Sequence, residues 1–428
     1  MVRQLLGCPP AFPRLAAAIS DHTLSLRTVC LRPSLQHRAV AGEALRTLCI
    51  EGWRGVNHSI AMVNQNQILE MVKLQGWRIS HRDAPYFLPH WDRSKLDSGF
   101  SAAERAIIDG LPAPGDAPID VCLRIASPVR AGEPGSARRN VTFVVTEFGL
   151  SDKSFEPSDL NPKRLTEGED FVITPSQWSR ARLLDYGFAP DKVQVVSHGY
   201  KTDTFKPMPA EQREQARQAL GLQPHETVFC NVGVATWNKG LDLLILAFAQ
   251  LRLMGLPVRL ILKDHKGLYG LGVESTFTEL AGRVPQLNSA QVRDGISILS
   301  TSLNLGQIRA LYCLSDAYVS SYRAEGFNLP VLEAMGCGTQ VIVSGGGATD
   351  DFIAPELSYR LRTRPGTPAD QPQVSGQYVI PDLDDLIHAM TEIAEGRRPD
   401  VAASLAARAR LAERYSWANV TNQLMALL

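Results

Sequence analysis

Short apolar runs alternate with longer amphipathic segments along most of this chain. The first run, LRTLCIEG, ends at Gly52 and is typical of a buried strand. From Ile60 to Val72, apolar residues recur every three or four positions, and the segment closes at Gly76. This spacing predicts a helix with one buried face. A strand, a loop and a helix therefore follow one another here.

The same alternation continues on both sides of a linker near residue 200. Before the linker, we expect further strands in the segments IDVCLRIA, VTFVVTE, DFVITPS and KVQVVSHG. After it, we expect strands in TVFCNVG, VRLILK, GISILS, DAYVSS and TQVIVS. Strands that alternate with helices form mostly parallel sheets covered on both faces. The pattern therefore predicts two doubly wound α/β domains, with ligands bound in the cleft beyond the carboxyl ends of the strands.

Chain length agrees with two domains, because 428 residues exceed what one hydrophobic core usually supports. We assign residues 1–44 to an N-terminal extension, 45–200 to a first domain and 201–405 to a second domain. Residues 406–428 are expected to form a C-terminal amphipathic helix that packs back toward the first domain. The extension carries an excess of arginine, which suits a solvated arm better than a binding surface for an acidic partner.

Charge and cysteine usage exclude several classes of protein. Basic and acidic residues balance at 44 each, so no overall field attracts nucleic acid or an anionic membrane. The seven cysteines are scattered and form no C-x-x-C pair, which argues against a disulfide framework and a zinc site. No apolar run reaches the ~20 residues of a membrane span. We expect a cytoplasmic protein without a nucleic-acid partner.

Two glutamates separated by seven residues, Glu325 and Glu333, flank an apolar turn between a predicted strand and a predicted helix. Gly326 would let the main chain approach a ligand, and the helix beginning near Leu329 presents unpaired N–H groups. The loop SGGGATDDF repeats this arrangement of strand, glycines and helix. The two carboxylates could act as a glycosidase-like acid–base pair. The glycine-rich loops instead favour a nucleotide sugar, with the diphosphate at the loops and the carboxylates at hydroxyls.

These residues resemble a known family. The segment EGFNLPVLEAMGCGTQVIVS is similar to the Glu-x7-Glu signature of retaining GT-B glycosyltransferases, the glycosyl transferases of group 1. VVSHGYKTDTF and VGVATWNKGLDLLILAF resemble further segments of that family, in the family's order. The resemblance implies two Rossmann-like domains that face each other across a cleft. It also implies metal-independent transfer of a hexose, with retention, from a UDP-, GDP- or ADP-sugar to a hydroxyl.

The resemblance assigns roles to individual residues of the second domain. Glu325 would contact the donor sugar, Glu333 the ribose and Lys239 the diphosphate. A fixed lysine and aimed N–H groups stabilise the charge that grows on a departing diphosphate. The remaining donor contacts that the resemblance implies are Gly326, Phe327, Asn328, Leu329, Gly346 and Gly347.

One position departs from the family pattern. Family members often carry a basic residue directly after the glycine of the VG pair, and here that residue is Val234. We expect Lys263, at the end of the next predicted strand, or Arg323, beside Glu325, to supply the missing charge to the donor. His198, at the domain junction, is expected either to face the donor or to pack the hinge.

The first domain offers candidates for binding the acceptor and for catalysis. His58 follows the first strand and could act as a base or bind hydroxyls. Its neighbours Asn57 and Ser59 suit the acceptor or a helix cap equally well. Arg124 and Glu147 end predicted strands and are expected to bind the acceptor.

Neither a metal ion nor another cofactor is expected. The acidic run from Asp382 to Asp385 precedes an apolar helix, so helix capping explains it better than metal binding. The acceptor would be a glycan, a lipid-linked saccharide or a small molecule in polysaccharide or glycan assembly. Peripheral contact with the inner face of a membrane stays open, as does the oligomeric state. A sugar-nucleotide epimerase, a phosphorylase and a non-catalytic partner subunit are the alternatives on the same fold.

Overall fold

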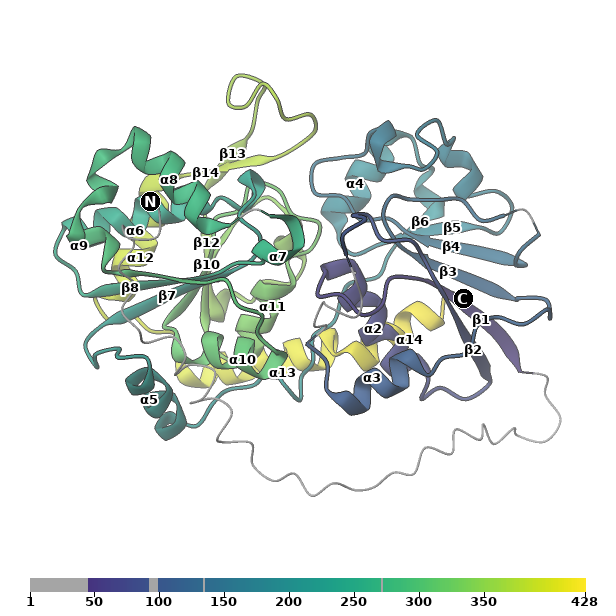
Figure 1. Ribbon diagram of the computed structural model, residues 1–428, viewed down its shortest axis with the longest axis horizontal. Coiled ribbons are helices and arrows are strands. Elements are labelled where there is room, and N and C mark those ends of the chain that lie inside the picture. The colour runs from purple at the N-terminus through teal and green to yellow at the C-terminus, as the bar shows by residue number, and fades with distance from the viewer. Residues whose placement is uncertain (1–44, 92–98, 134, 271) are drawn as a thin grey trace.

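The computed structural model describes residues 45–428 except 92–98, 134 and 271. In this part of the chain, two sheets of six parallel strands form two domains with helices packed against them (Figure 1). The predicted α/β architecture of two doubly wound domains is confirmed. The expectations for residues 1–44 lie outside the described residues.

The first sheet has the order β2-β1-β3-β4-β5-β6. Its strands are β1 (Arg46–Gly52), β2 (Trp77–Asp83), β3 (Val121–Ile125), β4 (Arg139–Phe143), β5 (Phe171–Thr174) and β6 (Val193–Val195). Its helices are α2 (Ser59–Met71), α3 (Ala102–Asp109) and α4 (Gln177–Tyr186). β2 was not predicted, because its sequence WRISHRD contains few apolar residues. It pairs with β1 along its whole length at the edge of the sheet.

The second sheet has the order β12-β11-β10-β7-β8-β9. Its strands are β7 (Thr227–Val232), β8 (Val258–Lys263), β9 (Ile296–Leu299), β10 (Ala317–Ser320), β11 (Gln340–Ser344) and β12 (Ser358–Leu361). The strand order reverses between β7 and β10, which is the usual position of a ligand in such sheets. The loops that follow these two strands carry Lys239 and Glu325, so the topology brings them together.

Helices of several lengths surround this sheet. They are α5 (Ala210–Ala219), α6 (Leu241–Leu253), α7 (Lys266–Tyr269), α8 (Val273–Arg283), α9 (Ala290–Arg293), α10 (Leu305–Leu314), α11 (Leu329–Gly336) and α12 (Leu383–Ala394). A hairpin of β13 (Thr363–Pro365) and β14 (Val379–Pro381) projects from the top of the domain in Figure 1. No helix in the described ranges is long and apolar enough to cross a membrane.

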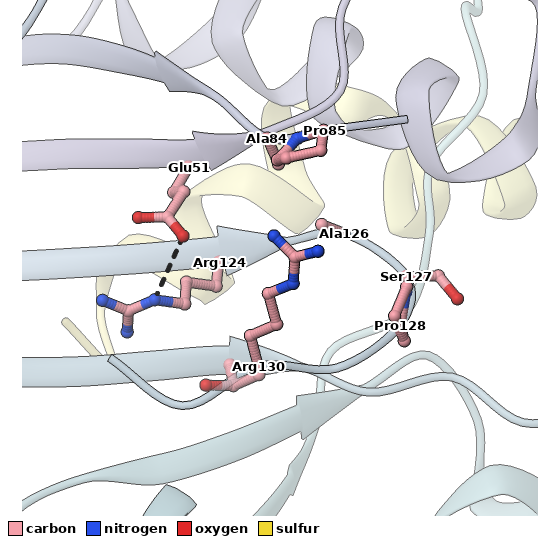
Figure 2. Close-up of a pocket in the computed structure, with 9 residues that line it drawn as sticks. Glu51, Ala84, Pro85, Arg124, Ala126, Ser127, Pro128 and Arg130 are labelled. Atoms are coloured by element: carbon pink, nitrogen blue, oxygen red, sulfur yellow. Dashed lines mark ion pairs between the residues drawn. The ribbon is translucent and has the colours of Figure 1, made fainter. Parts of the chain in front are cut away.

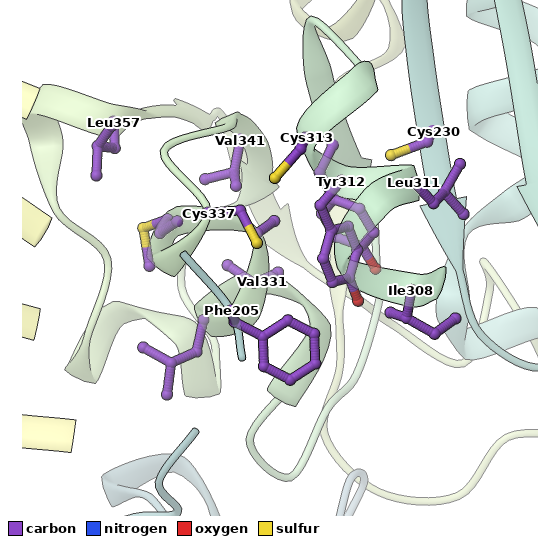
Figure 3. Packing of buried hydrophobic residues seen from close by; sticks show 14 of the residues in the cluster. Phe205, Cys230, Ile308, Leu311, Tyr312, Cys313, Val331, Cys337, Val341 and Leu357 are labelled. Atoms are coloured by element: carbon purple, nitrogen blue, oxygen red, sulfur yellow. The ribbon is translucent and has the colours of Figure 1, made fainter. Parts of the chain in front are cut away.

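The core beneath the second sheet fixes α10 against α11. Figure 3 shows Ile308, Leu311 and Tyr312 of α10 packed near Val331 of α11, and all four side chains are buried. Burial of these apolar side chains contributes roughly 1.5–3 kcal/mol per large residue. This packing determines which face of α11 turns toward the cleft, and therefore where Glu333 lies.

The C-terminal segment forms two helices, α13 (Val401–Tyr415) and α14 (Trp417–Met425), where the sequence predicted one. Ser416 adopts an extended conformation between them, and its hydroxyl accepts a hydrogen bond from the N–H of Asn419. A capping serine can start a new helix, so the apolar periodicity continues across the break. α14 packs against α2, with Trp417 and Val420 in contact with Val63. The chain thus returns to the first domain.

Candidate active site

The loops after β4, β7 and β10 meet in a cluster of opposite charges. The Nζ atom of Lys239 lies 2.8 Å from Oε1 of Glu147 and 2.9 Å from Oε2 of Glu325. The side-chain amide of Asn238 donates a hydrogen bond of 2.9 Å to Oε2 of Glu147. Glu147 belongs to the first domain and the other three residues belong to the second. The cluster therefore connects the two domains.

A short 3₁₀ turn, Trp237–Lys239, positions the lysine. Gly240 ends the turn with φ +65°, and a Cβ atom there would overlap the carbonyl oxygen of Ser321. The hydroxyl of Ser321 donates to the carbonyl oxygen of Gly240 over 2.8 Å. Glycine is needed for both the backbone angle and this close approach. The lysine–glycine pair thus packs directly on the end of β10.

Arg323 fixes the same turn from the other side. Its guanidinium makes a bidentate contact of 2.8 and 2.7 Å with Asp242, and its Nη1 donates to the carbonyl oxygen of Trp237. The guanidinium also stacks on the Trp237 ring at 4.5 Å. Its charge is therefore already paired with a carboxylate, and its predicted contact with the diphosphate stays a prediction.

The charges in this cluster shift one another's ionisation. Burial raises the pKa of Glu325 to about 7; the nearby Glu147 carboxylate acts in the same direction, and Lys239 opposes both. Burial opposes the charge on Lys239, but the two carboxylates outweigh it and hold the pKa of this lysine above its ordinary value. Lys239 is therefore a fixed positive charge at neutral pH, while Glu325 is a carboxyl group that can titrate there.

Glu333 lies on α11, as the fifth of its eight residues. The hydroxyl of Tyr312 donates a 3.0 Å hydrogen bond to its Oε2. Burial raises the pKa of Glu333 to about 7, and the hydrogen bond from Tyr312 opposes this rise. The second carboxylate of the motif is thus held by a buried phenol, a partner that the sequence pattern did not reveal.

The chain bends sharply into α11 at Asn328. Among the described residues, Asn328 is the one non-glycine residue with a positive φ, +81°. Its side-chain amide donates to the hydroxyl of Ser320 over 2.9 Å, which helps hold this conformation. Such strain of a non-glycine residue often marks a functional loop. The neighbouring Leu329 is half-buried at the start of the helix.

Gly326 lies close to residues of the first domain, whereas the sequence predicted a close approach to a ligand. A Cβ atom at this position would overlap Cγ2 of Val145, and the hydroxyl of Ser176 donates to the carbonyl oxygen of Gly326 over 2.7 Å. Both partners belong to the first domain. In this structure, the missing side chain allows the two domains to touch, whereas the sequence suggested an approach to a ligand. Its predicted donor contact is not tested by this geometry.

The second glycine loop differs from the predicted strand–loop–helix pattern. Gly346 has φ +75°, and its N–H donates to Oδ2 of Asp350 over 2.9 Å. Gly347 packs against the ring of Tyr322. The following segment, Ala348–Asp351, is a single 3₁₀ turn. The helix expected here is therefore wrong, and this loop lacks the N-terminus of an α-helix.

Phe327 and His198 belong to the packing at the domain junction. Their ring centroids lie 4.9 Å apart, and the imidazole also packs against Phe143 and Trp417. Burial lowers the pKa of His198 to about 3, so the ring is neutral at ordinary pH. These contacts match the hinge-packing alternative for His198. The side chain of Phe327 is buried as well.

Lys263 lies at the end of β8, next to the position of the missing family charge. The N–H of Gly233 donates to the carbonyl oxygen of Lys263 over 3.0 Å, which places Lys263 beside the loop that contains Val234. The lysine ammonium is buried and donates to the carbonyl oxygen of Asp264. Burial lowers the pKa of Lys263 to about 8. A nearby anion stabilises a buried ammonium, and the predicted contact of Lys263 with the donor stays a prediction.

His58 caps α2, so the expectation that Asn57 or Ser59 caps this helix is wrong. Its Nδ1 atom accepts the N–H of Ile60 over 3.1 Å. Burial lowers the pKa of His58 to about 4, and Lys239 and His265 act in the same direction. The remaining proton must therefore lie on Nε2, and the ring is neutral. In this structure the Nδ1 lone pair is used by the cap and the Nε2–H can donate a hydrogen bond to a hydroxyl, while the predicted role of His58 as a base stays a prediction.

Arg124 lies apart from the charged cluster, on a polar face of the first sheet. Its Nη1 donates to Oδ1 of Asn140 over 2.9 Å, and its Nε lies 3.5 Å from Glu51. Figure 2 shows Arg124 and Arg130 beside a small hollow at the ends of the strands. The hollow has a volume of about 10 Å³, room for about one water molecule. Asn57 lies half-buried in the loop after β1.

Two aromatic clusters that sequence reasoning missed span the two domains. In one, Phe148 stacks on Trp237 at 6.4 Å, and the N–H of Gln377 in the β13–β14 loop donates to the carbonyl oxygen of Phe148. In the other, the indole of Trp91 donates to the carbonyl oxygen of Leu268 over 2.8 Å. No local sequence pattern could reveal these pairs, because each forms only when the domains meet.

The described residues contain no group of three or more His, Cys, Asp or Glu that could hold a metal ion. The acidic run at the start of α12 serves the helix, since Asp382 accepts the N–H of Asp385 as an N-cap. This agrees with the capping interpretation of that run.

Comparison with known proteins finds a family match within the second domain. The model of a family described as Glycosyl transferases group 1 matches residues 212–359, about a third of the chain. Over 272 residues, the chain is 24% identical to a D-inositol 3-phosphate glycosyltransferase of Gordonia bronchialis, covering 62% of this chain and 53% of that protein. It is also 24% identical over 271 residues to a lipopolysaccharide 1,2-N-acetylglucosaminetransferase of Salmonella typhimurium, covering 63% of each. The chain spans about half the length of the inositol phosphate relatives it matches.

A likeness in structure extends over both domains. The crystal structure of Anabaena HepE in complex with UDP superposes with a TM-score of 0.60 at 15% identity, covering 89% of this chain and 99% of that chain. This likeness shows the fold, which is the GT-B fold.

Proposed function

Because residues 212–359 match the model of the family Glycosyl transferases group 1, we propose that this protein is a glycosyltransferase. It moves a sugar from a nucleotide sugar to a hydroxyl acceptor and retains the configuration at the sugar carbon. The observation that carries the proposal is the contact of Lys239 with Glu325 at the reversal of strand order, next to the N-terminus of α11.

The chemistry follows from the charges around this point. The sugar–phosphate bond breaks and the acceptor oxygen bonds to the same face of the sugar carbon, while the acceptor proton passes to the departing phosphate oxygen. Lys239 is held cationic by its neighbours, so it stabilises the charge that develops on the diphosphate. The N–H groups at the start of α11 act in the same direction.

The two glutamates of the motif bind hydroxyls in this proposal. Glu325 would contact the transferred sugar beside Lys239, and Glu333 would contact the ribose. Burial raises the pKa of each to about 7, and both carboxyl groups are poorly solvated. A sugar hydroxyl would therefore supply a hydrogen bond that water does not.

The identities of the donor and the acceptor are inferred from similar proteins. The complex of HepE with UDP supports a nucleoside diphosphate donor, and the names of the sequence relatives favour a phosphorylated or lipid-linked acceptor. Nucleotide sugars place such an enzyme in the cytoplasm, in contact with a membrane surface when the acceptor is lipid-linked. Val234 and the paired state of Lys239 favour a non-catalytic partner subunit as the second candidate.

A thermal-shift panel of UDP, GDP, ADP and their sugars tests the proposal. A ligand that binds only the folded protein raises its melting temperature with concentration, by RT ln(1 + [L]/Kd) in free energy. We expect one nucleotide series to raise the melting temperature and its sugar to be consumed when an acceptor extract is added. Absence of a shift with every nucleotide would overturn the donor assignment. Binding without turnover would favour the partner subunit.

A further inference from the structure

We propose that Glu147 is an internal competitor of the donor diphosphate: it occupies Lys239 when the site is empty and leaves it when a nucleoside diphosphate binds. This inference rests on the proposed function, because it assumes that the diphosphate binds at Lys239. It assigns Glu147 a role at the donor, whereas its position after β4 alone suggested only a contact with the acceptor.

The first step is the geometry of the contact. Both carboxylate oxygens of Glu147 are used, Oε1 by the ammonium of Lys239 and Oε2 by the amide of Asn238. These partners are consecutive residues of one turn. The carboxylate of Glu147 thus takes the position on this turn that the anionic oxygens of a ligand would take.

The second step is the charge balance. Lys239 carries one positive charge and contacts two carboxylates, Glu147 and Glu325. A bound diphosphate would add further negative charge beside two carboxyl groups that already share the single positive charge of Lys239. Like charges this close repel strongly in a poorly solvated site. One carboxylate must therefore move away, and Glu325 is the less mobile of the two because its side chain is buried at the start of the α11 loop.

The third step asks which of the two partners can move, the turn that carries Lys239 or the side chain of Glu147. The turn that carries Lys239 is held rigidly, since the N–H of Arg323 donates to the carbonyl oxygen of Asn238 over 2.6 Å. The main chain of Glu147 is held as well, because the indole of Trp178 donates to its carbonyl oxygen over 2.7 Å. The Glu147 side chain, however, is 40% exposed. A rotation of this side chain alone releases Lys239, and no separation of the domains is needed.

The fourth step is the consequence for turnover. When the sugar has been transferred, the nucleoside diphosphate must leave Lys239. The return of Glu147 to the lysine while the diphosphate departs replaces the contacts that the product loses, so it speeds product release. Release of product limits the rate of many enzymes. Glu147 would thus weaken the binding of the product and raise the rate of turnover.

Isothermal titration with UDP and UMP, and with the GDP/GMP and ADP/AMP pairs, tests this inference on the full chain. Glu147→Gln keeps the shape and an acceptor for Asn238 but removes the charge. We expect the Kd of the nucleoside diphosphate to fall about fivefold in this variant. This factor corresponds to the free energy of one partly exposed ion pair. The Kd of the monophosphate should change by less than about twofold, because a nucleotide that lacks the second phosphate does not need Lys239. Glu147→Ala should give the same pattern.

Glu169→Gln is the matched control, since it removes the same charge from an exposed side chain at the opposite end of the first sheet. It should leave both affinities unchanged. An unchanged or weaker diphosphate affinity in Glu147→Gln would overturn the inference, and so would equal tightening of the diphosphate and the monophosphate. Failure of every nucleotide to bind the wild type and the variants would instead overturn the proposed function.

Discussion

The ammonium of Lys239 lies 2.9 Å from a carboxylate oxygen of Glu325, and the two residues come from loops that follow neighbouring strands, β7 and β10. The contact joins two motifs that are distant in the sequence. It exists because the strand order reverses between these strands, which brings the carboxyl ends of both to one point. The proposed chemistry depends on this point being rigid.

Substitution of Gly240 by alanine tests this rigidity. The residue has φ +65°, and a Cβ atom would overlap the carbonyl oxygen of Ser321. We expect Gly240→Ala to lower the free energy of unfolding by about 3 kcal/mol or more, from backbone strain together with the overlap. Urea denaturation measures the change.

Gly221→Ala is the control for Gly240→Ala. Gly221 has a similar φ of +71°, but a Cβ atom there would meet nothing within 4 Å. This variant should lose only about 1 kcal/mol, the cost of the backbone angle. Equal losses in the two variants would show that the packing of the lysine turn on β10 is unimportant.

The contact of Gly326 with Val145 predicts coupling between the domains. A methyl group at Gly326 would overlap Cγ2 of Val145, so Gly326→Ala should destabilise the protein by about 1–3 kcal/mol. Val145→Ala removes the overlapping atom, and the double variant should recover most of the stability lost by Gly326→Ala. A double-mutant cycle in urea measures this. Additive losses would contradict the observed contact.

A pH series on Glu333→Gln tests the state of the second glutamate. Burial raises the pKa of Glu333 to about 7, above its ordinary value of 4.5. Between these values the folded protein keeps a proton that the unfolded chain releases, so unfolding becomes easier as the pH rises. We expect wild-type stability to fall relative to Glu333→Gln by on the order of 3 kcal/mol from pH 4.5 to 7.5. Urea denaturation at each pH measures it, and a difference independent of pH would contradict the account.

Much of the fold could be predicted because buried strands and amphipathic helices leave strong local patterns. β2 escaped because an edge strand with exposed charged residues, such as Arg78 and Arg82, lacks the apolar run of a buried strand. The break at Ser416 escaped because a capping residue interrupts the main chain without interrupting the apolar periodicity. Both features were missed for the same reason. A pairing partner strand or a backbone angle determines them, and neither changes the local pattern of apolar residues.

The candidate site also has residues that could be predicted from the sequence and contacts that could not. The motif residues Glu325, Glu333 and Lys239 could be selected from the sequence, because each lies in a recognisable loop or helix. The ion pair of Lys239 with Glu147 could not, since it depends on how the two domains meet. The tautomer of His58 could not either, because it depends on the ring accepting the N–H of Ile60. Contacts between domains and the placement of protons require the structure.

Binding of nucleoside diphosphates to Lys239→Met tests the central claim most directly. Methionine keeps most of the length of the side chain and removes the charge. Lys73→Met makes the same change at an exposed lysine that follows α2 and lies outside the site. Isothermal titration with the nucleotide selected by the thermal-shift panel should show wild-type affinity for Lys73→Met and a loss of about 100-fold for Lys239→Met. Equal affinity of Lys239→Met and the wild type would contradict the account.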